Sequence, residues 1–304
     1  MKYAFIFPGQ GSQAIGMGKD FYENYALAKE LFDNASDILK IDMKSLLFEE
    51  NDNINQTKFT QSAILLVSYI AYKLFNEQNK AKPIFALGHS LGEISANLVS
   101  NAMSFESAIN LVYKRGELMQ RACENVDAGM AVVIGIDDKS LQDFCKENQN
   151  IWCANYNSDG QSVLAGSKEA LFKAEENIKK IGAKRFLILP MSVASHCPLL
   201  SSILEDFREI LDKSLIDNFD FEIISNATVE TYSSKAKAID LLTRQLVEPV
   251  FYKQSILNNQ DRIDCFIEFG YGSVLKGLNK RISSKPTYSI GDIKSLESTL
   301  NELN

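Results

Sequence analysis

The sequence predicts an α/β fold in which a small βαββαβ domain is inserted into a larger domain built on a parallel sheet. A short apolar run at 84–87 is followed by a glycine-flanked turn and a helix-compatible segment, as in the strand, turn and helix of a parallel sheet. From 128 to 189, strand and helix patterns follow one another in the order βαββαβ, and the α/β pattern returns after residue 220.

The first expected strand covers residues 3–7 and ends at a Pro-Gly turn. The loop that follows has Gly-x-Gly-x-x-Ala spacing over residues 9–14, so a nucleotide-binding enzyme is one alternative. That fingerprint needs a second strand ending in an acidic residue about twenty positions later. Residues 22–39 instead have the periodicity of one amphipathic helix, which favours a different interpretation, that Gln10 faces the turn at residue 90.

That turn is the sequence Gly-His-Ser-Leu-Gly at 88–92, which has the G-x-S-x-G pattern of a nucleophile elbow. The glycines would allow a sharp turn and leave the Ser90 hydroxyl exposed. The N–H of Leu91, at the start of the following helix, would then face negative charge developing on a carbonyl oxygen. The alternative is a loop serine that only caps a helix, but the strand before it and the helix after it favour the elbow.

Two amphipathic helices are expected over 55–77 and 104–121. Arg115 lies on the apolar stripe of the second helix, three residues after Val112 and four before Met119, so its guanidinium should point inward. A buried guanidinium needs an anionic partner. An internal salt bridge and a receptor for a substrate carboxylate both remain open, since the planar guanidinium suits either.

The segment after residue 126 has the element order of a ferredoxin-like unit. The expected elements are strand 130–136, helix 140–148, strand 151–154, strand 162–165, helix 168–181 and strand 185–189. We therefore assign residues 126–196 to an inserted ferredoxin-like small domain, and residues 1–125 with 197–304 to a large α/β-hydrolase-like domain. Strands at 221–225 and 265–269 and helices at 236–246 and 273–282 belong to its second part.

A serine hydroxyl is a weak nucleophile until a base takes its proton, and histidine suits that task near neutral pH. The chain has only two histidines. His89 adjoins Ser90, and neighbouring side chains on a sharp turn usually diverge. His196, in a Ser- and Pro-rich loop at the domain junction, is therefore the expected base, although a buried histidine with a purely structural role is the alternative.

Composition argues against several classes of function. With 32 Lys and Arg against 39 Asp and Glu, the net charge is -7, which gives no electrostatic footprint for nucleic acid. Five cysteines without C-x-x-C spacing and two histidines support neither a disulfide framework nor a metal site. The longest apolar stretch, 63–74, is too short to cross a bilayer, and 1–7 lacks a signal-peptide pattern, so we expect a cytoplasmic protein without membrane association.

Several motifs together resemble those of the malonyl-CoA:acyl carrier protein transacylases of fatty acid synthesis, along almost the whole chain. The motifs are Phe7-Pro8-Gly9-Gln10-Gly11-Ser12-Gln13, Gly88-His89-Ser90-Leu91-Gly92-Glu93, Arg115-Gly116, Ala154-Asn155-Tyr156-Asn157-Ser158, Ser195-His196-Cys197 and Glu268-Phe269-Gly270-Tyr271-Gly272. The resemblance implies transfer of malonyl from malonyl-CoA to the phosphopantetheine thiol of acyl carrier protein through a malonyl-serine, with no cofactor and in a monomer.

The resemblance also implies a role for individual residues. Ser90 would be the acylated nucleophile, His196 its base and Arg115 the receptor for the malonyl carboxylate.

The backbone N–H groups of Gln10 and Leu91 would form the oxyanion hole, and Gln61 would contribute to substrate binding. In the family, a backbone carbonyl near a Pro-Val-Gln-Trp stretch orients the histidine. Here that stretch is Pro249-Val250-Phe251-Tyr252, which makes Phe251 the expected orienting residue.

A serine hydrolase acting on thioesters or esters is the main alternative, because it would share the elbow. A buried Arg115 favours a dicarboxylic acyl group, and an inserted small domain would shield the acyl-enzyme from water. α/β-Hydrolases usually place the histidine near the chain end, whereas more than a hundred residues follow His196. A non-catalytic binding module would leave the pairing of Ser90 with His196 unexplained.

Overall fold

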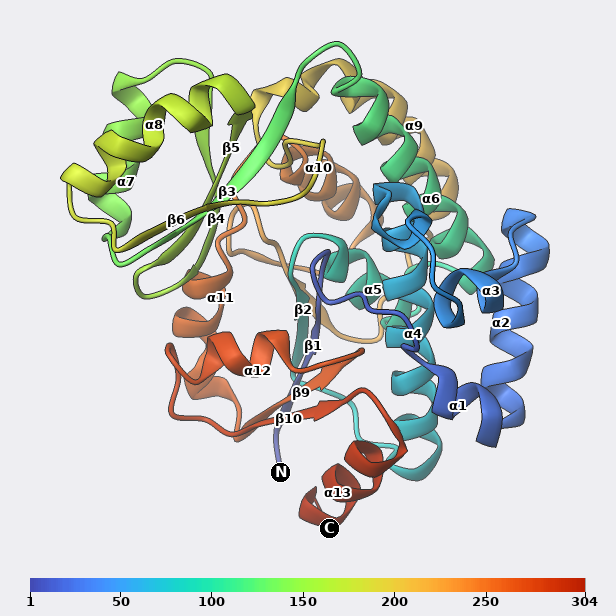
Figure 1. Ribbon diagram of the computed structural model, residues 1–304. Coiled ribbons are helices and arrows are strands. Elements are labelled where there is room, and N and C mark those ends of the chain that lie inside the picture. The colour runs from blue at the N-terminus through green and yellow to red at the C-terminus, as the bar shows by residue number, and fades with distance from the viewer. Residues whose placement is uncertain (304) are drawn as a thin grey trace.

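A computed structural model describes residues 1–303, which form a six-stranded sheet and a separate four-stranded sheet (Figure 1). The larger sheet has the order β10-β9-β1-β2-β7-β8, and all its pairings are parallel except that of β7 with β8. Its strands are β1 Tyr3–Phe7, β2 Phe85–Gly88, β7 Glu222–Ile224, β8 Thr231–Tyr232, β9 Cys265–Phe269 and β10 Thr287–Ile290. The predicted mixed α/β class with a parallel sheet is confirmed.

The four-stranded sheet is antiparallel, with the order β4-β5-β3-β6. Its strands are β3 Ala128–Ile134, β4 Ile151–Ser158, β5 Gln161–Ser167 and β6 Arg185–Ile188. Helices α7 (Asp138–Glu147) and α8 (Lys168–Lys180) cover its outer face, at the upper left of Figure 1. All these elements lie within the predicted small domain, whose boundaries at 126 and 196 stay a prediction.

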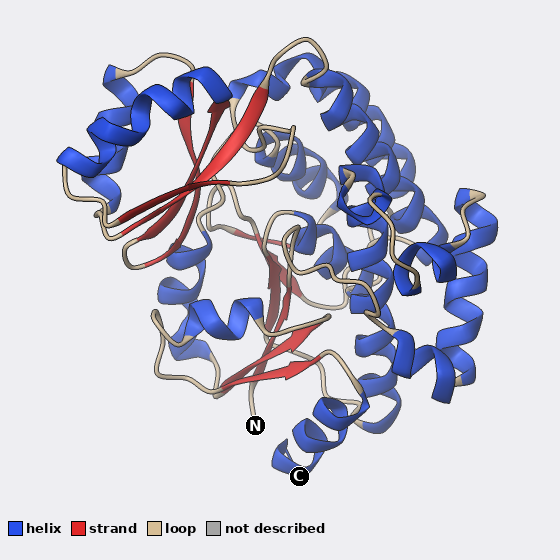
Figure 2. Cartoon of the chain, viewed as in Figure 1, coloured by secondary structure: helices blue, strands red, loops and turns tan. Residues whose placement is uncertain are grey.

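The remaining helices surround the larger sheet (Figure 2). They are α1 Lys19–Asn24, α2 Ala26–Leu39, α3 Met43–Phe48, α4 Thr57–Gln78, α5 Leu91–Val99, α6 Phe105–Ala122, α9 Leu204–Ser214, α10 Lys235–Gln245, α11 Tyr252–Asn259, α12 Val274–Asn279 and α13 Ile293–Leu303, with short 3₁₀ helices at Asn53–Asn55, Pro198–Ile203 and Gln260–Arg262. The single helix expected over 22–39 is wrong. Tyr25 is extended (φ -121°, ψ 126°) and separates α1 from α2, so that Phe21 and Phe32 both reach the core from separate helices.

Helices cover both faces of the parallel sheet, which explains why its strands are continuously apolar. On β1, Tyr3, Phe5 and Phe7 pack into the cluster that includes α2, α4, α5 and α6. Ala4 and Ile6 point the other way, into a cluster with residues of α11 and α12. Side chains of a strand alternate between the two faces, so a strand between two helical layers has no polar side. Among residues 1–303, no helix is long and apolar enough to cross a membrane.

The smaller sheet lies beyond the carboxyl ends of β1 and β2 (Figure 1). Backbone hydrogen bonds join it to the larger part of the chain, because Val250 N donates to Ala154 O (2.8 Å) and Tyr156 N donates to Val250 O (2.9 Å). The carboxyl ends of parallel strands are the usual position of a ligand site in an open α/β sheet. We therefore expect the functional site to lie between the two sheets.

Candidate active site

Ser90 lies at the turn between β2 and α5 and has a strained backbone, with φ 53° and ψ -105°. A positive φ is rare for residues other than glycine and persists where the surrounding contacts fix it. The N–H of Ser90 donates to Asn226 Oδ1 (2.7 Å), and its C=O accepts from Gln245 Nε2 (3.1 Å). Asn226 Nδ2 also donates to the carbonyl of Gly88 (2.7 Å). Two segments remote in sequence thus hold the elbow in shape.

The glycines of the elbow are required by close packing. A Cβ on Gly88 would lie 1.8 Å from the backbone carbon of Gly92, and one on Gly92 would lie 2.0 Å from the carbonyl oxygen of Phe7. Gly9 is in a similar position, because a Cβ there would lie 2.2 Å from the carbonyl oxygen of His89. Without side chains at these glycines, the loop after β1 can pack directly against the elbow.

We expect Gly92→Ala to destabilise the protein by about 3 kcal/mol, the upper end of the usual cost of overpacking, because the added methyl meets rigid backbone. Gly277→Ala is the matched control, since Gly277 is exposed on α12 and a Cβ there meets nothing within 4 Å. Alanine favours helices, so this variant should be neutral or slightly more stable. Urea unfolding measures both. Equal stability of the two variants would contradict the role of packing at Gly92.

Of the two histidines, His196 is the one whose ring reaches Ser90. Its Nε2 lies 2.7 Å from Ser90 Oγ, and its Nδ1 lies 2.6 Å from the backbone oxygen of Gln245. A carbonyl oxygen only accepts, so Nδ1 carries the hydrogen and Nε2 is free to accept from the serine hydroxyl. His89 Nε2 instead lies 2.8 Å from Asn157 Oδ1.

The environment keeps His196 neutral. Burial lowers its pKa to about 3, and the nearby Arg115 cation acts in the same direction, against the hydrogen bond to the Gln245 carbonyl. The imidazole is therefore in its basic form at neutral pH. A neutral imidazole within hydrogen-bonding distance of a serine hydroxyl is the arrangement needed for general-base catalysis.

The prediction that Phe251 orients His196 is wrong, because the orienting carbonyl belongs to Gln245. Gln245 is the last residue of α10, and the last carbonyls of a helix have no partner within it. The Phe251 carbonyl accepts from the N–H and hydroxyl of Ser255 in α11 (2.9 and 2.8 Å). The Phe251 ring stacks on Tyr156, with centroids 5.3 Å apart. Phe251 therefore serves packing and the start of α11.

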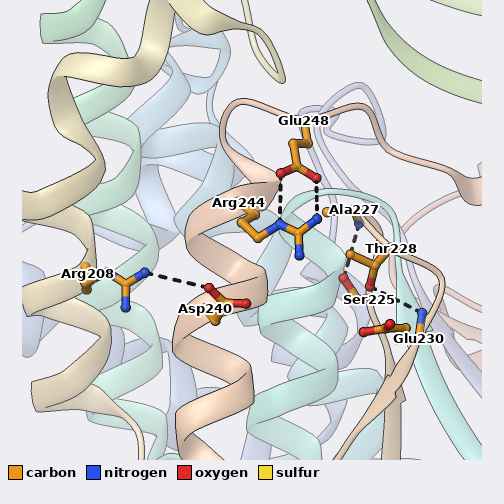
Figure 3. A network of polar contacts seen from close by, with 8 residues as sticks. All are labelled: Arg208, Ser225, Ala227, Thr228, Glu230, Asp240, Arg244 and Glu248. Atoms are coloured by element: carbon orange, nitrogen blue, oxygen red, sulfur yellow. Dashed lines mark hydrogen bonds and ion pairs between the residues drawn. The ribbon is translucent and has the colours of Figure 1, made fainter.

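Figure 3 shows polar contacts around the turn at 225–230 and the end of α10. These are the two segments whose residues Asn226 and Gln245 hold the elbow. Serine and threonine side chains stabilise the turn, with Ala227 N donating to Ser225 Oγ (3.2 Å) and Glu230 N to Thr228 Oγ1 (3.4 Å).

On the outer side of α10, the guanidinium of Arg244 contacts both carboxylate oxygens of Glu248 (2.8 and 3.0 Å), and Arg208 of α9 lies 3.8 Å from Asp240 (Figure 3). Exposed pairs of this kind contribute about 1 kcal/mol or less. The buried contacts of Gln245 are therefore the stronger constraint on this helix end.

Arg115 is 1% exposed and points at the nucleophile. Its guanidinium donates to Gln61 Oε1 (3.0 Å), Gln245 Oε1 (3.0 Å) and Ser90 Oγ (3.2 Å). No carboxylate in residues 1–303 forms a direct ion pair with it. Burial lowers its pKa to about 10, so it stays charged at neutral pH. A buried cation with only neutral partners favours the carboxylate-receptor alternative over an internal salt bridge.

A cavity of about 260 Å³ lies above Ser90, between the two sheets. Gln10, Gln61, Leu91, Arg115 and His196 all line it. Its walls also include apolar side chains of the smaller sheet and of α12, namely Met130, Val132, Val163, Val274, Leu275 and Leu278. An apolar pocket with a few convergent polar groups is typical of a binding site for a small molecule.

Asn226, Gln245 and Glu93 are residues of this site that the sequence analysis did not identify. Gln245 follows Leu241 and Leu242 by four and three positions, on the apolar face of α10, which is the signal that identified Arg115. Asn226 lies in an irregular turn, where no such periodicity exists.

Comparison with known proteins shows what the chain is similar to. The family described as "Acyl transferase domain" matches residues 4–293. A malonyl CoA-acyl carrier protein transacylase of Bacillus subtilis is 36% identical over 99% of this chain and 97% of its own length. The crystal structure of a malonyl-CoA:acyl carrier protein transacylase from Helicobacter pylori is 56% identical, covers 100% of this chain and 98% of its own, and has a TM-score of 0.98.

A second solved structure is titled as a complex of a type II PKS acyl-carrier protein with its malonyl-transacylase. Its matching chain is 34% identical, covers 99% of this chain and 100% of its own, and has a TM-score of 0.96.

Proposed function

Because the chain belongs to the malonyl-CoA:acyl carrier protein transacylase family of acyl transferases, we propose that it transfers malonyl from malonyl-CoA to the phosphopantetheine thiol of an acyl carrier protein. The observation that carries this proposal is the position of Arg115. Its cation lies 3.2 Å from the hydroxyl of Ser90, where it would hold the free carboxylate of a malonyl group.

In the first half-reaction, Ser90 Oγ attacks the thioester carbon of malonyl-CoA while His196 Nε2 takes the hydroxyl proton. The N–H groups of Gln10 and Leu91 would hold the negative oxygen of the tetrahedral intermediate. The C–S bond then breaks, and His196 returns the proton to the leaving coenzyme A sulfur. The products are malonyl-Ser90 and free coenzyme A. The Gln245 carbonyl stabilises the imidazolium while it carries the proton.

The second half-reaction runs the same steps with a different thiol. The phosphopantetheine thiol of the carrier protein gives its proton to His196, and the sulfur attacks the malonyl-Ser90 carbon. The C–O bond to Ser90 breaks, and His196 reprotonates the serine. Every group that this route requires is a protein side chain, a backbone N–H or carbonyl, or a substrate, so we propose that the reaction uses no cofactor.

Transfer is favoured over hydrolysis by the way in which the cavity is enclosed. The smaller sheet contributes Met130, Val132 and Val163 to the wall of the cavity that holds Ser90, and these apolar side chains disfavour water near the acyl-serine. Gln61 would support the carboxylate site because its Oε1 accepts a hydrogen bond from the Arg115 guanidinium (3.0 Å).

The function is tested by intact mass in two steps. Brief incubation with malonyl-CoA should add one malonyl group to the protein, and addition of a holo acyl carrier protein should remove it and load the carrier. Rapid loss of the adduct in buffer, with no loading of the carrier, would favour the hydrolase.

Four finer assignments belong to the same proposal. The antiparallel order β4-β5-β3-β6 with α7 and α8 on one face supports a ferredoxin-like small domain at 126–196. The elbow at the end of β2 supports an α/β-hydrolase-like large domain at 1–125 and 197–304. We also propose that the protein is cytoplasmic and that it acts as a monomer.

The acceptor should dock on a local basic surface, because carrier proteins of this pathway are expected to be acidic while this chain has net charge -7. Candidates are Lys184 and Arg185 at the start of β6, and an α12 basic group formed by Lys276, Lys280 and Arg281. Val274, Leu275 and Leu278 of α12 line the cavity, so the helix next to this group lies beside the cavity. Arg281 also donates to Gln161 (2.9 Å), which lines the cavity.

We expect Lys276→Glu with Lys280→Glu to raise the KM for the carrier protein by roughly threefold to tenfold, because exposed charges contribute up to about 1 kcal/mol each. Acylation by malonyl-CoA should change little, and high salt should weaken only the second half-reaction. The same test applies to Lys184→Glu with Arg185→Glu. A control pair, Lys29→Glu with Lys294→Glu on α2 and α13, should leave both half-reactions unchanged. A salt-insensitive second half-reaction, unaffected by either reversal, would contradict electrostatic docking.

A further inference from the structure

A fully buried carboxylate lies beneath the elbow, on the first turn of α5. Glu93 is 0% exposed and accepts hydrogen bonds from Asn226 N (2.9 Å), Gln245 Nε2 (2.7 Å) and Tyr232 OH (2.9 Å). All three neighbours donate, so they suit the ionised form. The N-terminal end of a helix also favours negative charge. Burying a charged group costs free energy, and a fully hydrogen-bonded buried carboxylate therefore indicates that Glu93 has a function.

Gln245 connects this carboxylate to the reacting groups. Its amide nitrogen donates to Glu93, and its amide oxygen accepts from Arg115 (3.0 Å). Only one orientation of the amide satisfies both neighbours, because an ionised carboxylate only accepts and a guanidinium only donates. The backbone oxygen of the same residue orients His196. Gln245 is thus the shared support of the base and of the cation.

We propose that Glu93 is a positioning residue of the transfer reaction, which fixes the side chain of Gln245 and through it both the guanidinium of Arg115 and the carbonyl that orients His196. Glu93 also supplies the negative charge that balances Arg115 across the amide while the cavity holds no substrate. Its role rests on the proposed malonyl transfer, since it acts on the groups that carry out that reaction.

The charge of Glu93 should appear in the pH profile. Burial raises its pKa to about 7, against the hydrogen bonds from Asn226, Gln245 and Tyr232 and the charge of Arg115. Protonation would place a hydrogen on a carboxylate oxygen that now accepts, so either the Tyr232 hydroxyl would have to turn from donor to acceptor or a contact would break. The supported form is the ionised one, and the rate of Ser90 acylation should therefore fall as the pH falls through about 7.

The other charged or titratable groups that face Glu93 change charge at pH values far from neutral. They are Tyr232 on β8, Arg115 on α6 and, beyond Gln245, His196. The pKa of Tyr232 is raised well above its ordinary value by burial, that of Arg115 is about 10 and that of His196 is about 3. An acidic limb near neutral pH is thus distinguishable from titration of the base.

Glu93→Gln keeps the shape of the side chain and removes its charge. We expect kcat for malonyl transfer to fall about tenfold to a hundredfold, the loss typical of a buried hydrogen bond to a charged group. The KM for malonyl-CoA should stay the same or fall, because Arg115 remains and no longer has a competing anion. The acidic limb near neutral pH should disappear.

Tyr232→Phe tests the same role without touching Gln245. Glu93 loses one donor, so its pKa should rise and the acidic limb should move to higher pH. Glu268→Gln is the matched control. Glu268 is also 0% exposed in the larger sheet, but it accepts from Leu275 N, Lys276 N and Ser289 Oγ and has no contact with Gln245. Its variant should keep the acidic limb of the wild-type enzyme.

Two results would overturn the role of Glu93. They are a Glu93→Gln variant with wild-type kcat, whether or not its KM is raised, and an acidic limb that stays in place in both Glu93→Gln and Tyr232→Phe. If Glu93→Gln does not fold, the position of the acidic limb in the pH profile of Tyr232→Phe still tests the proposal. Absence of malonyl transfer by the wild-type enzyme would instead count against the proposed function itself.

Discussion

A Ser90→Ala variant incubated with malonyl-CoA is expected to gain no malonyl mass and to lose transfer by at least about ten-thousandfold. Ser90 Oγ is the only hydroxyl within hydrogen-bonding distance of His196 in the described residues, at 2.7 Å. Removal of the nucleophile removes the covalent route, and the remaining groups can only bind substrate. Intact mass spectrometry and a carrier-loading assay measure the two effects.

Two controls accompany the Ser90 variant. His196→Ala should acylate slowly, because it keeps the attachment site and loses only the base. Ser95→Ala removes a buried serine hydroxyl of α5, the helix that begins after Ser90. This hydroxyl has no hydrogen-bond partner within residues 1–303, so the variant should behave as wild type. A malonyl adduct on Ser90→Ala would show that another residue is the nucleophile.

An Arg115→Ala variant should lose malonyl transfer by about a hundredfold, which corresponds to the few kcal/mol of a buried charged hydrogen-bonded pair. Acetyl transfer should fall much less, because an acetyl group has no carboxylate for the guanidinium to bind. The ratio of kcat/KM for malonyl-CoA to that for acetyl-CoA therefore measures the specificity that Arg115 contributes.

The control for this variant is Arg121→Ala, on the same helix. Arg121 is exposed and pairs with Asp206 at the surface, so its removal should leave the ratio unchanged. Equal losses of malonyl and acetyl transfer in a folded Arg115→Ala protein would indicate a purely structural role for the cation.

Local sequence patterns were sufficient for most of the fold. The apolar run 3–7 and the alternation of strands and helices from 128 to 189 both correspond to elements of the structure. Periodicity predicts which face of an element is buried, and it correctly predicted that Arg115 on α6 is buried. It failed at Tyr25, where an extended residue divides the helix expected over 22–39 while apolar residues continue on either side.

The sequence by itself identified the nucleophile elbow, because the pattern of glycines at 88 and 92 around a serine, after a strand and before a helix, is local. Only the tertiary structure decided what surrounds that serine. Gln245 rather than Phe251 supplies the carbonyl for His196, and Asn226 and Glu93 complete the support of the elbow. Asn226 and Gln245 lie 136 and 155 residues from Ser90 in the chain, and Gln245 lies 49 residues from His196. A hydrogen bond depends on distances of a few tenths of an ångström, which are set by how helices and strands pack and not by the local pattern that forms them.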